Sequence, residues 1–305
     1  MNRRKLVNIP ASIHQQLLAS AEKNSVDFLD ILRRYGTERF LFRLSESRYA
    51  EEFVLKGAAL FLIWTGEYYR PTRDIDFLSL DPLEPKSAES MIREICSRSF
   101  PDDGLIFDQD SIKAGRIKED DIYNGVRVTL QAKLDRTRIP VRIDIGFGDA
   151  MTPHAIPADF PVLLDLPVPH LLIYSRETVI AEKYEALVEL GLANSRMKDF
   201  YDLWILATAF TFDGILLKTA IQATFRRRKT PLPDGEPIAF TAAFTADPVK
   251  HAQWRAFLNK NELTKKEADM TKVISLISAF VMPPTLAAVH SAKFTKKWKP
   301  GGNWV

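Results

Sequence analysis

The chain has 305 residues, of which 46% are apolar and 27% charged, and its formal net charge is +3. This is the composition of an ordinary globular protein with one large domain or two. The small net charge excludes a basic character of the whole chain, so any polyanion-binding surface must be local. The one cysteine, Cys96, excludes an intrachain disulfide and a thiolate-rich metal site.

The first residues, MNRRKLVNIPASIHQQ, are basic, but no apolar segment follows them, which argues against a secretion signal. The longest apolar runs, ALFLIW and VISLISAFVM, are shorter than the roughly 20 residues that span a bilayer. We therefore expect a cytoplasmic protein that makes no membrane contact.

Apolar positions three and four residues apart predict helices between about residues 11 and 47. A short lead-in and a helix at Ala58–Trp64 follow, and then a β-rich segment, DIDFLSL, that stops at Asp81-Pro82. The segment PKSAESMIREICSRSF is an amphipathic helix ended by Pro101. Two alternating segments, DIYNGVRVTLQAKLD and IPVRIDIGFGD, predict strands, with Asn124-Gly125 as a hairpin turn.

A proline-rich connector from Pro153 to Pro169 is the candidate domain boundary. Beyond it the patterns are helical, and a last helix around KVISLISAF is expected to be closed by Pro283-Pro284. We predict an N-terminal part at 1–170, a helical C-terminal domain at 171–292, and a basic, mobile tail at 293–305.

Asp74 and Asp76 are two acids within an apolar run. Residues two apart on a strand share a face, and two carboxylates about 4 Å apart repel by about 4 kcal/mol at an effective dielectric near 20. A divalent cation turns this repulsion into a binding site, and Mg²⁺ prefers carboxylate and phosphate oxygens. The alternative is a strand whose acids both face water.

The surroundings of the pair favour a phosphate ligand. Arg70 and Arg73 lie just upstream and can hold a polyanion. Lys56-Gly57 precedes the predicted helix, and a glycine there lets backbone N–H groups approach a ligand. Gly57 could equally be an ordinary turn glycine.

Asp144, in VRIDIGFGD, is a further acid on a predicted strand. A third carboxylate beside the D-x-D pair is what a two-metal phosphoryl-transfer centre needs. A lone aspartate in a strand is more often simply exposed, and Asp149 ranks lower because it falls in a loop.

Lys183 lies within the apolar face of a predicted helix, where a lysine either extends to the surface or faces an anion. Asp199 and Asp202 are likewise charged residues on an apolar face, that of the next predicted helix. An ion pair between Lys183 and one of these acids would explain all three residues without catalysis.

Two basic runs have ordinary explanations. The run FRRRK, Phe225–Lys229, is expected to be a solvated helix end. The tail sequence KFTKKWK mixes lysines with aromatics, which suits an RNA backbone with base stacking, although basic tails are common.

Taken together, KGAALFLIWTGEYYRPTRDIDF, VRIDIGFGD and ETVIAEKYEALVELGLANSRMKDFYDLW resemble the AbiEii/AbiGii group of toxins, which includes MenT-like members, in the polymerase-β-like nucleotidyltransferase superfamily. The resemblance runs from about Phe53 to beyond Trp204. It implies an α+β fold with a mixed β-sheet nucleotidyltransferase core flanked by helices and a helical C-terminal domain.

The resemblance also implies roles for the residues. Asp74, Asp76 and Asp144 would hold Mg²⁺ or Mn²⁺, and Lys183 would contact the triphosphate. Asp199 or Asp202 would join the active site. The nucleotide-binding residues would be Lys56, Gly57, Ala58, Arg70, Thr72, Arg73 and Lys183.

The implied activity is the transfer of NMP from an NTP to an acceptor, with a tRNA 3′ end as the expected acceptor and a separate antitoxin as partner. One departure is that Ala58 and Ala59 follow Gly57, where many superfamily members carry a serine hydroxyl. The alternatives are transfer to a protein or a small molecule such as an antibiotic, a metal-dependent phosphodiesterase, and a non-catalytic binding partner.

Overall fold

The structure is a computed structural model that describes residues 8–66, 72–117, 125–263 and 269–305. It divides into two compact units. Unit 1 comprises Met1–Gly148 and Ile156–Ile173, and unit 2 comprises Asp149–Ala155 and Tyr174–Val305. The chain therefore passes between the units at 148/149, 155/156 and 173/174.

Unit 1 is built on a seven-stranded mixed sheet with the order β3-β4-β5-β2-β1-β7-β6. β2 pairs in parallel with β5 and antiparallel with β1, and β1 pairs in parallel with β7. The strands are β1 Phe53–Lys56, β2 Asp74–Ser79, β3 Leu105–Arg116, β4 Gly125–Leu134, β5 Thr137–Phe147, β6 Ile156–Asp159 and β7 His170–Ile173.

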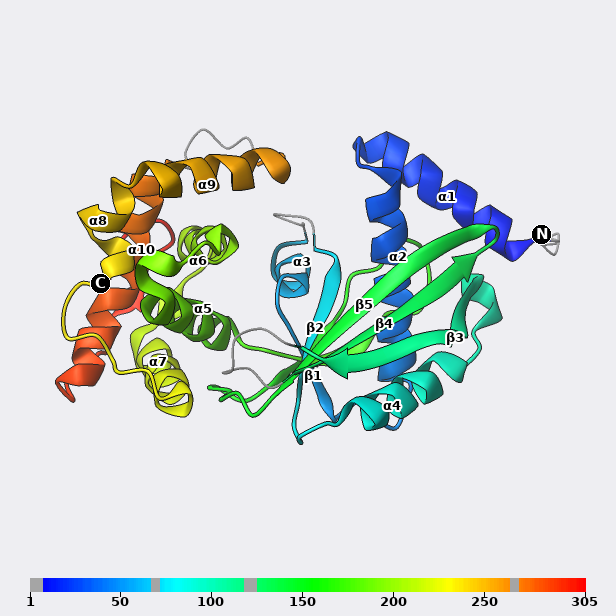
Figure 1. Cartoon of the computed structure of the whole chain (residues 1–305), viewed down its shortest axis with the longest axis horizontal. Helices are drawn as coiled ribbons and strands as arrows, with labels where there is room; N and C mark the ends of the chain where they lie inside the picture. Colours follow the sequence, from blue (N-terminus) through cyan, green and yellow to red (C-terminus); the bar gives the residue numbers. More distant parts are fainter. Residues whose placement is uncertain (1–7, 67–71, 118–124, 264–268) are drawn as a thin grey trace. The chain divides into compact units, whose positions relative to one another are not determined.

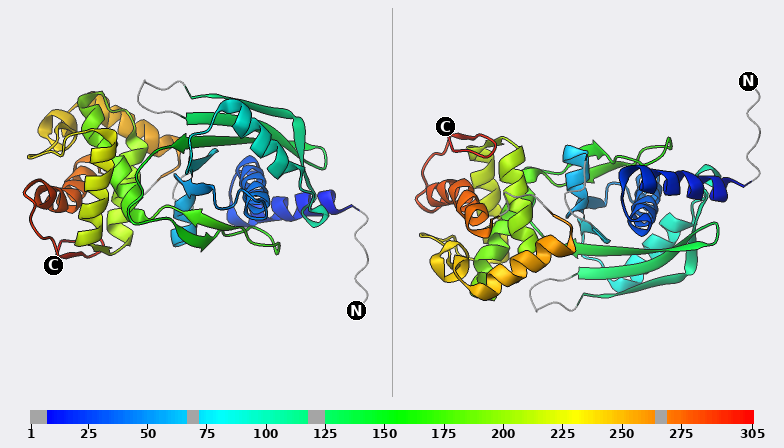
Figure 2. Two further views of the ribbon diagram at one scale, coloured as in Figure 1. Left: turned by 90° about the horizontal axis from the view of Figure 1, so that it is seen from below. Right: turned by 90° about the horizontal axis from the view of Figure 1, so that it is seen from above.

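One face of this sheet is covered by helices α2 (Phe28–Ser45) and α4 (Pro85–Ser97), which also contact each other (Figures 1 and 2). A Cβ atom on Gly36 of α2 would lie 3.0 Å from Ile139 Cγ2 on β5, so the absence of a side chain permits the close approach. The other helices of unit 1 are α1 Ile9–Asn24, α3 Ala59–Thr65 and the 3₁₀ turn Pro101–Asp103.

A buried polar network on α2 holds the proline-rich segment to unit 1. Glu38 accepts a hydrogen bond from the backbone N–H of Leu163 at 3.0 Å, and Arg39 Nη2 donates to the Pro167 carbonyl at 3.1 Å. Arg43 forms a bidentate pair with Asp103 in which both side chains are buried. The segment between β6 and β7 therefore packs onto unit 1 rather than acting as a free linker.

Unit 2 is helical, with α5 and α7 packed together and α10 lying against α6 and α7 (Figure 1). Its helices are α5 Arg176–Leu190, α6 Met197–Ala209, α7 Gly214–Arg228, α8 Ala242–Thr245, α9 Pro248–Lys260, α10 Met270–Val289 and the 3₁₀ turns Gly191–Ala193 and Ile238–Phe240. A two-stranded sheet joins β8 Phe212–Asp213 to β9 Lys297–Trp298.

Helix α10 corrects one expectation, because it continues through Pro283 and Pro284 to Val289. Pro284 cannot donate to the carbonyl of Phe280, four residues earlier. The indole N–H of Trp304 donates to that carbonyl instead, at 3.0 Å. A partner from the tail thus satisfies the backbone oxygen that the proline leaves without its helical partner.

The C-terminal tail, which we expected to be mobile, is packed against the helices of unit 2. Trp298 is fully buried, and its indole N–H donates to the Ala207 carbonyl at 2.7 Å. The Trp304 ring stacks on Phe280 with a centroid separation of 6.0 Å. Trp298 is therefore a core residue, whereas Lys293, Lys296, Lys297 and Lys299 are exposed.

The mixed sheet, its flanking helices and the helical C-terminal part confirm the predicted α+β fold. Strand β3 had no counterpart in the prediction, and the turn at Asn124 falls outside the described residues. In the part of the chain that the structure describes, only α10 is long and apolar enough to cross a membrane. Half of its most apolar 18-residue window is buried, as in the core helix of a globular protein, so its length and composition are weak evidence for a membrane span.

Candidate active site

The alternation of DIDF on β2 separates its apolar and acidic side chains. Ile75 and Phe77 are each 1% exposed, on the face covered by helices. Asp74 and Asp76 are partly exposed on the opposite face. Because β2 lies between β1 and β5, the two acids sit within the sheet and not at its edge.

A row of four charged residues crosses this face at one level. The strand register places Arg127 of β4 opposite Asp144 of β5, Asp144 opposite Asp76 of β2, and Asp76 opposite Lys56 of β1. Partners on adjacent strands point to the same face and lie about 5 Å apart. The two acids therefore lie side by side, with a cationic residue on either side.

Asp144 is held by a bidentate ion pair. Arg127 Nε lies 2.8 Å from Asp144 Oδ1, and Arg127 Nη2 lies 2.7 Å from Asp144 Oδ2. This fork geometry gives the strong form of a charge-assisted pair. Both carboxylate oxygens of Asp144 thus have a cationic donor.

Asp74 is held more loosely. It lies opposite Arg142 of β5, whose Nη1 is 3.3 Å from Asp74 Oδ1. That buried oxygen has no hydrogen-bond partner among the described residues. Asp74 therefore has one oxygen with a single cationic contact, in contrast to the two hydrogen bonds that hold Asp144.

Gly57 lies under the carboxylate of Asp76. Its φ is +75°, and a Cβ atom on it would collide with Asp76 Oδ2. A side chain at this position is thus excluded by backbone conformation and by space. The sequence left open whether Gly57 was an ordinary turn residue, and the structure ties it to the acidic pair.

Lys56 reaches across β2 towards β5. Its Nζ lies 3.6 Å from the position that a Cβ atom on Gly146 would take, an ordinary contact distance, so the ammonium group lies over β5. Ala58 is 6% exposed and caps α3 without a side-chain hydrogen bond. Any contact of Ala58 with a nucleotide would come from its backbone.

The segment before β2 carries the remaining predicted nucleotide-binding residues. Thr72 Oγ1 donates to the Asp74 carbonyl at 3.2 Å, which fixes the start of the strand, and Arg73 is exposed. Arg70 lies outside the described residues.

Unit 2 contains the second predicted group. Lys183 Nζ on α5 lies 2.8 Å from Asp199 Oδ1 and 2.7 Å from Asp202 Oδ2 on α6. Arg196 Nε lies 2.9 Å from Asp199 Oδ2. Burial works to raise the pKa of Asp199, but Lys183 and Arg196 outweigh it and hold the pKa below its ordinary value. The structural ion pair considered from the sequence is therefore present, and Lys183 bridges both acids.

The acids of unit 1 provide oxygen ligands of the type that Mg²⁺ takes. Asp74 Oδ1, which has only the 3.3 Å ion-pair contact with Arg142 among the described residues, and Asp76 on the same face suit a cation. No group of three or more His, Cys, Asp or Glu side chains in the described ranges is arranged to hold a metal ion. The residues present thus fit a cation site centred on Asp74 and Asp76, while both carboxylate oxygens of Asp144 are hydrogen-bonded to Arg127.

Sequence reasoning missed several arginines. Arg127 and Arg142 could not be recognised because they meet the acids only through strand register. Arg228, in the basic run expected to be solvated, is 10% exposed and pairs with Glu185 at 2.7 Å and Asp149 at 3.4 Å. Only its neighbours Arg226, Arg227 and Lys229 are exposed as expected.

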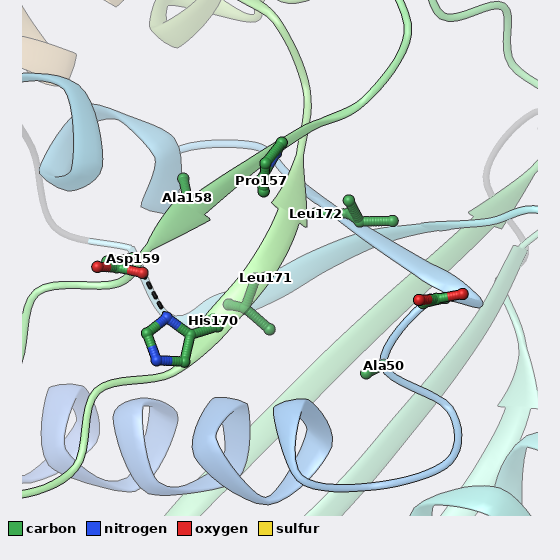
Figure 3. A pocket seen from close by; sticks show the side chains of 8 residues that line it. Ala50, Pro157, Ala158, Asp159, His170, Leu171 and Leu172 are labelled. Atoms are coloured by element: carbon green, nitrogen blue, oxygen red, sulfur yellow. Dashed lines mark hydrogen bonds and ion pairs between the residues drawn. The ribbon is translucent and has the colours of Figure 1, made fainter.

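A separate pocket of about 510 Å³ lies beside β6, β7 and the Ala50–Glu51 turn (Figure 3). His170 Nδ1 contacts Asp159 Oδ1 at its rim, and both side chains are exposed. None of the predicted site residues lines this pocket.

Comparison with known proteins gives one family. The family model described as nucleotidyl transferase AbiEii toxin, type IV TA system, matches residues 39–275. No curated protein matches the sequence.

Two solved structures from Helicobacter pylori are similar. JHP933 has 14% identity and a TM-score of 0.45, and the match covers 83% of this chain and 90% of that one. A candidate nucleotidyltransferase has 14% identity and a TM-score of 0.46, with 84% and 94% covered.

Proposed function

The chain belongs to the family of AbiEii nucleotidyl transferase toxins of type IV toxin–antitoxin systems, and we propose that it transfers NMP from an NTP to the 3′ end of a tRNA in a Mg²⁺-dependent reaction. The family supplies the nucleotidyl transfer, the NTP substrate and an antitoxin as partner. The observation that supports the proposal is the pairing of Asp76 with Asp144 on adjacent strands, in a row flanked by Arg127 and Lys56.

In this proposal Asp74 and Asp76 hold the divalent cation, which supplies charge neutralisation at the triphosphate and a lowered pKa for the attacking hydroxyl. Asp74 Oδ1 is held only by the single 3.3 Å contact with Arg142 among the described residues. Gly57 leaves the space that the Asp76 carboxylate occupies. Asp144 is the third acid of the same face.

Positive charge for the triphosphate comes from residues around the acids. Lys56 extends its ammonium group over Gly146, and Arg73 is exposed just before β2. Cationic donors of this kind bind phosphate oxygens through charge-assisted hydrogen bonds. The serine hydroxyl that is absent after Gly57 is replaced, in this proposal, by these two side chains.

We assign Lys183 to the triphosphate as well, with Asp199 and Asp202 orienting its ammonium group. The two ion pairs, at 2.8 and 2.7 Å, fix the position of Nζ while 13% of the side chain stays exposed. The same pairs cross-link α5 to α6, so Lys183 has a structural role in addition to the proposed one.

The proposed RNA acceptor is supported by the tail. Lys293, Lys296, Lys297 and Lys299 are exposed on a segment anchored by the β8–β9 pairing. Ordered lysines provide sequence-independent phosphate contacts. Since Trp298 is buried, stacking on this aromatic residue is not part of the proposal. We place the reaction in the cytoplasm.

The test uses NTPs labelled at the α-phosphate, incubated with separate pools of tRNA, protein and small molecules. We expect label in tRNA, with release of pyrophosphate, and no label with Asp76→Asn. Asp159→Asn, an exposed acid on β6, is the matched control and should retain transfer.

Each other outcome contradicts part of the proposal. Label in the protein or small-molecule pool would show that the acceptor is a protein or a small molecule and not tRNA. RNA cleavage without incorporation of label would indicate a phosphodiesterase. Equal behaviour of Asp76→Asn and the wild type, in cation-dependent NTP binding and in toxicity on expression, would remove the catalytic role of the acids and leave a binding partner.

A further inference from the structure

The pair between Arg127 and Asp144 has a consequence for cation binding. Each oxygen of Asp144 accepts a hydrogen bond from a different nitrogen of one guanidinium, at 2.8 and 2.7 Å. The Asp144 side chain is 17% exposed and that of Arg127 37% exposed, so the pair is only partly solvated. A cation can take Asp144 as a ligand only when at least one of these hydrogen bonds gives way.

We propose that Arg127 is a built-in competitor of the divalent cation for Asp144. Asp74 and Asp76 bind the cation first, and Asp144 joins only when Arg127 releases it. This inference rests on the proposed function, because it concerns the cation site of that function.

The charges of the row explain why a competitor is present. Asp76 and Asp144 are register partners on adjacent strands, so their charges repel. Arg127 and Lys56 flank them, and the four formal charges sum to zero. Without Arg127 the row carries one net negative charge, which attracts a divalent cation more strongly.

The contrast with Asp74 gives the order of binding. Arg142 approaches Asp74 through a single contact of 3.3 Å, its side chain is 49% exposed, and Asp74 Oδ1 has no hydrogen bond within the described residues. Arg127 makes two short bonds in a fork, which is the stronger arrangement. Of the two arginines, Arg127 is therefore the one that restrains cation binding.

The experiment measures Mn²⁺ binding to the full-length protein without nucleotide, from the electron paramagnetic resonance signal of free Mn²⁺. Arg127→Gln should bind Mn²⁺ about tenfold or more tightly than the wild type, the factor expected when hydrogen bonds between charged groups stop competing. Arg127→Lys keeps the charge but loses the fork, so its affinity should lie between the two.

Two further variants isolate the effect. Arg138→Gln changes an exposed arginine elsewhere on β5 and should leave the affinity unchanged. In an Asp144→Asn background, Arg127→Gln should raise the affinity by a clearly smaller factor, because the contested ligand is absent and only the loss of a nearby positive charge remains. Thermal unfolding without Mn²⁺ checks that each variant is folded. If Arg127→Gln does not fold, Arg127→Lys is compared with the wild type in its place.

The outcomes separate this inference from the function on which it rests. If the wild type binds Mn²⁺, Asp76→Asn abolishes binding, and Arg127→Gln binds equally or more weakly, the competition is refuted while the cation site stands. If neither the wild type nor Arg127→Gln binds Mn²⁺, the proposed cation site is refuted as well.

Discussion

Gly57 lies so close to the Asp76 carboxylate that a Cβ atom on the glycine would overlap Asp76 Oδ2. This relationship joins two motifs that are 19 positions apart in the sequence. It explains the glycine, which leaves space for the acid that we propose holds the cation.

Gly57→Ala should therefore reduce pyrophosphate release by roughly 100-fold, because displacement of a reacting group by about 1 Å is costly. It should also lower the free energy of unfolding by about 1–2 kcal/mol, from the left-handed backbone alone. Gly66→Ala is the matched control, with a φ of +77° and no atom of the described residues within 4 Å of the added carbon. It should share the stability loss and keep the activity, and equal activities of the two variants would contradict the argument.

Lys183→Met should lower the free energy of unfolding by about 3–5 kcal/mol, because it leaves Asp199 and Asp202 buried without their shared cation. Urea unfolding measures the change. Lys260→Met, at an exposed lysine of α9, should lie within about 0.5 kcal/mol of the wild type. A stable Lys183→Met protein that has lost NTP transfer would show that the ion pairs contribute little and that the lysine serves the nucleotide alone.

Acid should weaken the same cluster. The pKa of Asp199 is below 3.8 in the folded protein, so its stabilising contribution is complete above pH 3.8 and is lost as the pH falls through the folded value. The stability difference between the wild type and Asp199→Asn, measured by urea unfolding between pH 6 and pH 3, should therefore shrink below about pH 4. A constant difference over this range would contradict the role given to the charged form.

Arg228→Met should lower the free energy of unfolding by about 3–5 kcal/mol, since the arginine neutralises the buried Glu185 and contacts Asp149. Arg226→Met, in the same basic run but exposed, should change it by less than about 0.5 kcal/mol. Equal effects in thermal unfolding would mean that the run acts only as a solvated helix end.

Trp304→Phe should lower the free energy of unfolding by about 1–3 kcal/mol. The Phe280 carbonyl loses its indole donor, and Pro284 has no N–H that could replace it. Val305→Ala, at an exposed neighbour, is the control and should be close to neutral. Unchanged urea unfolding of Trp304→Phe would show that water replaces the indole at this carbonyl.

Sequence periodicity predicted most helices and the two-sided character of β2, because these depend on residues close together in the chain. Strand β3 escaped detection because a register irregularity between Asp108 and Lys113 interrupts its alternation. The end of α10 was misplaced because the partner of the Phe280 carbonyl, Trp304, is 24 residues away.

The site shows the same division. Asp74 and Asp76 stand out in their own strand, and the order of the dispersed motifs indicated Asp144, Lys183 and the acids of α6. Arg127 stayed hidden because it meets Asp144 only through the pairing of β4 with β5. The register of two strands depends on the turn between them and on packing, which no local pattern records.

The threefold passage of the chain between the units limits how the protein can be dissected. A fragment ending at Gly148 would lack β7, the parallel partner of β1, and β1 carries Lys56 and leads into Gly57. A fragment ending at Ile173 would complete that sheet but would also carry residues 149–155, which belong to the helical unit. No single truncation point yields both units intact, so chimaeras with related toxins need paired exchange points on either side of residues 149–155.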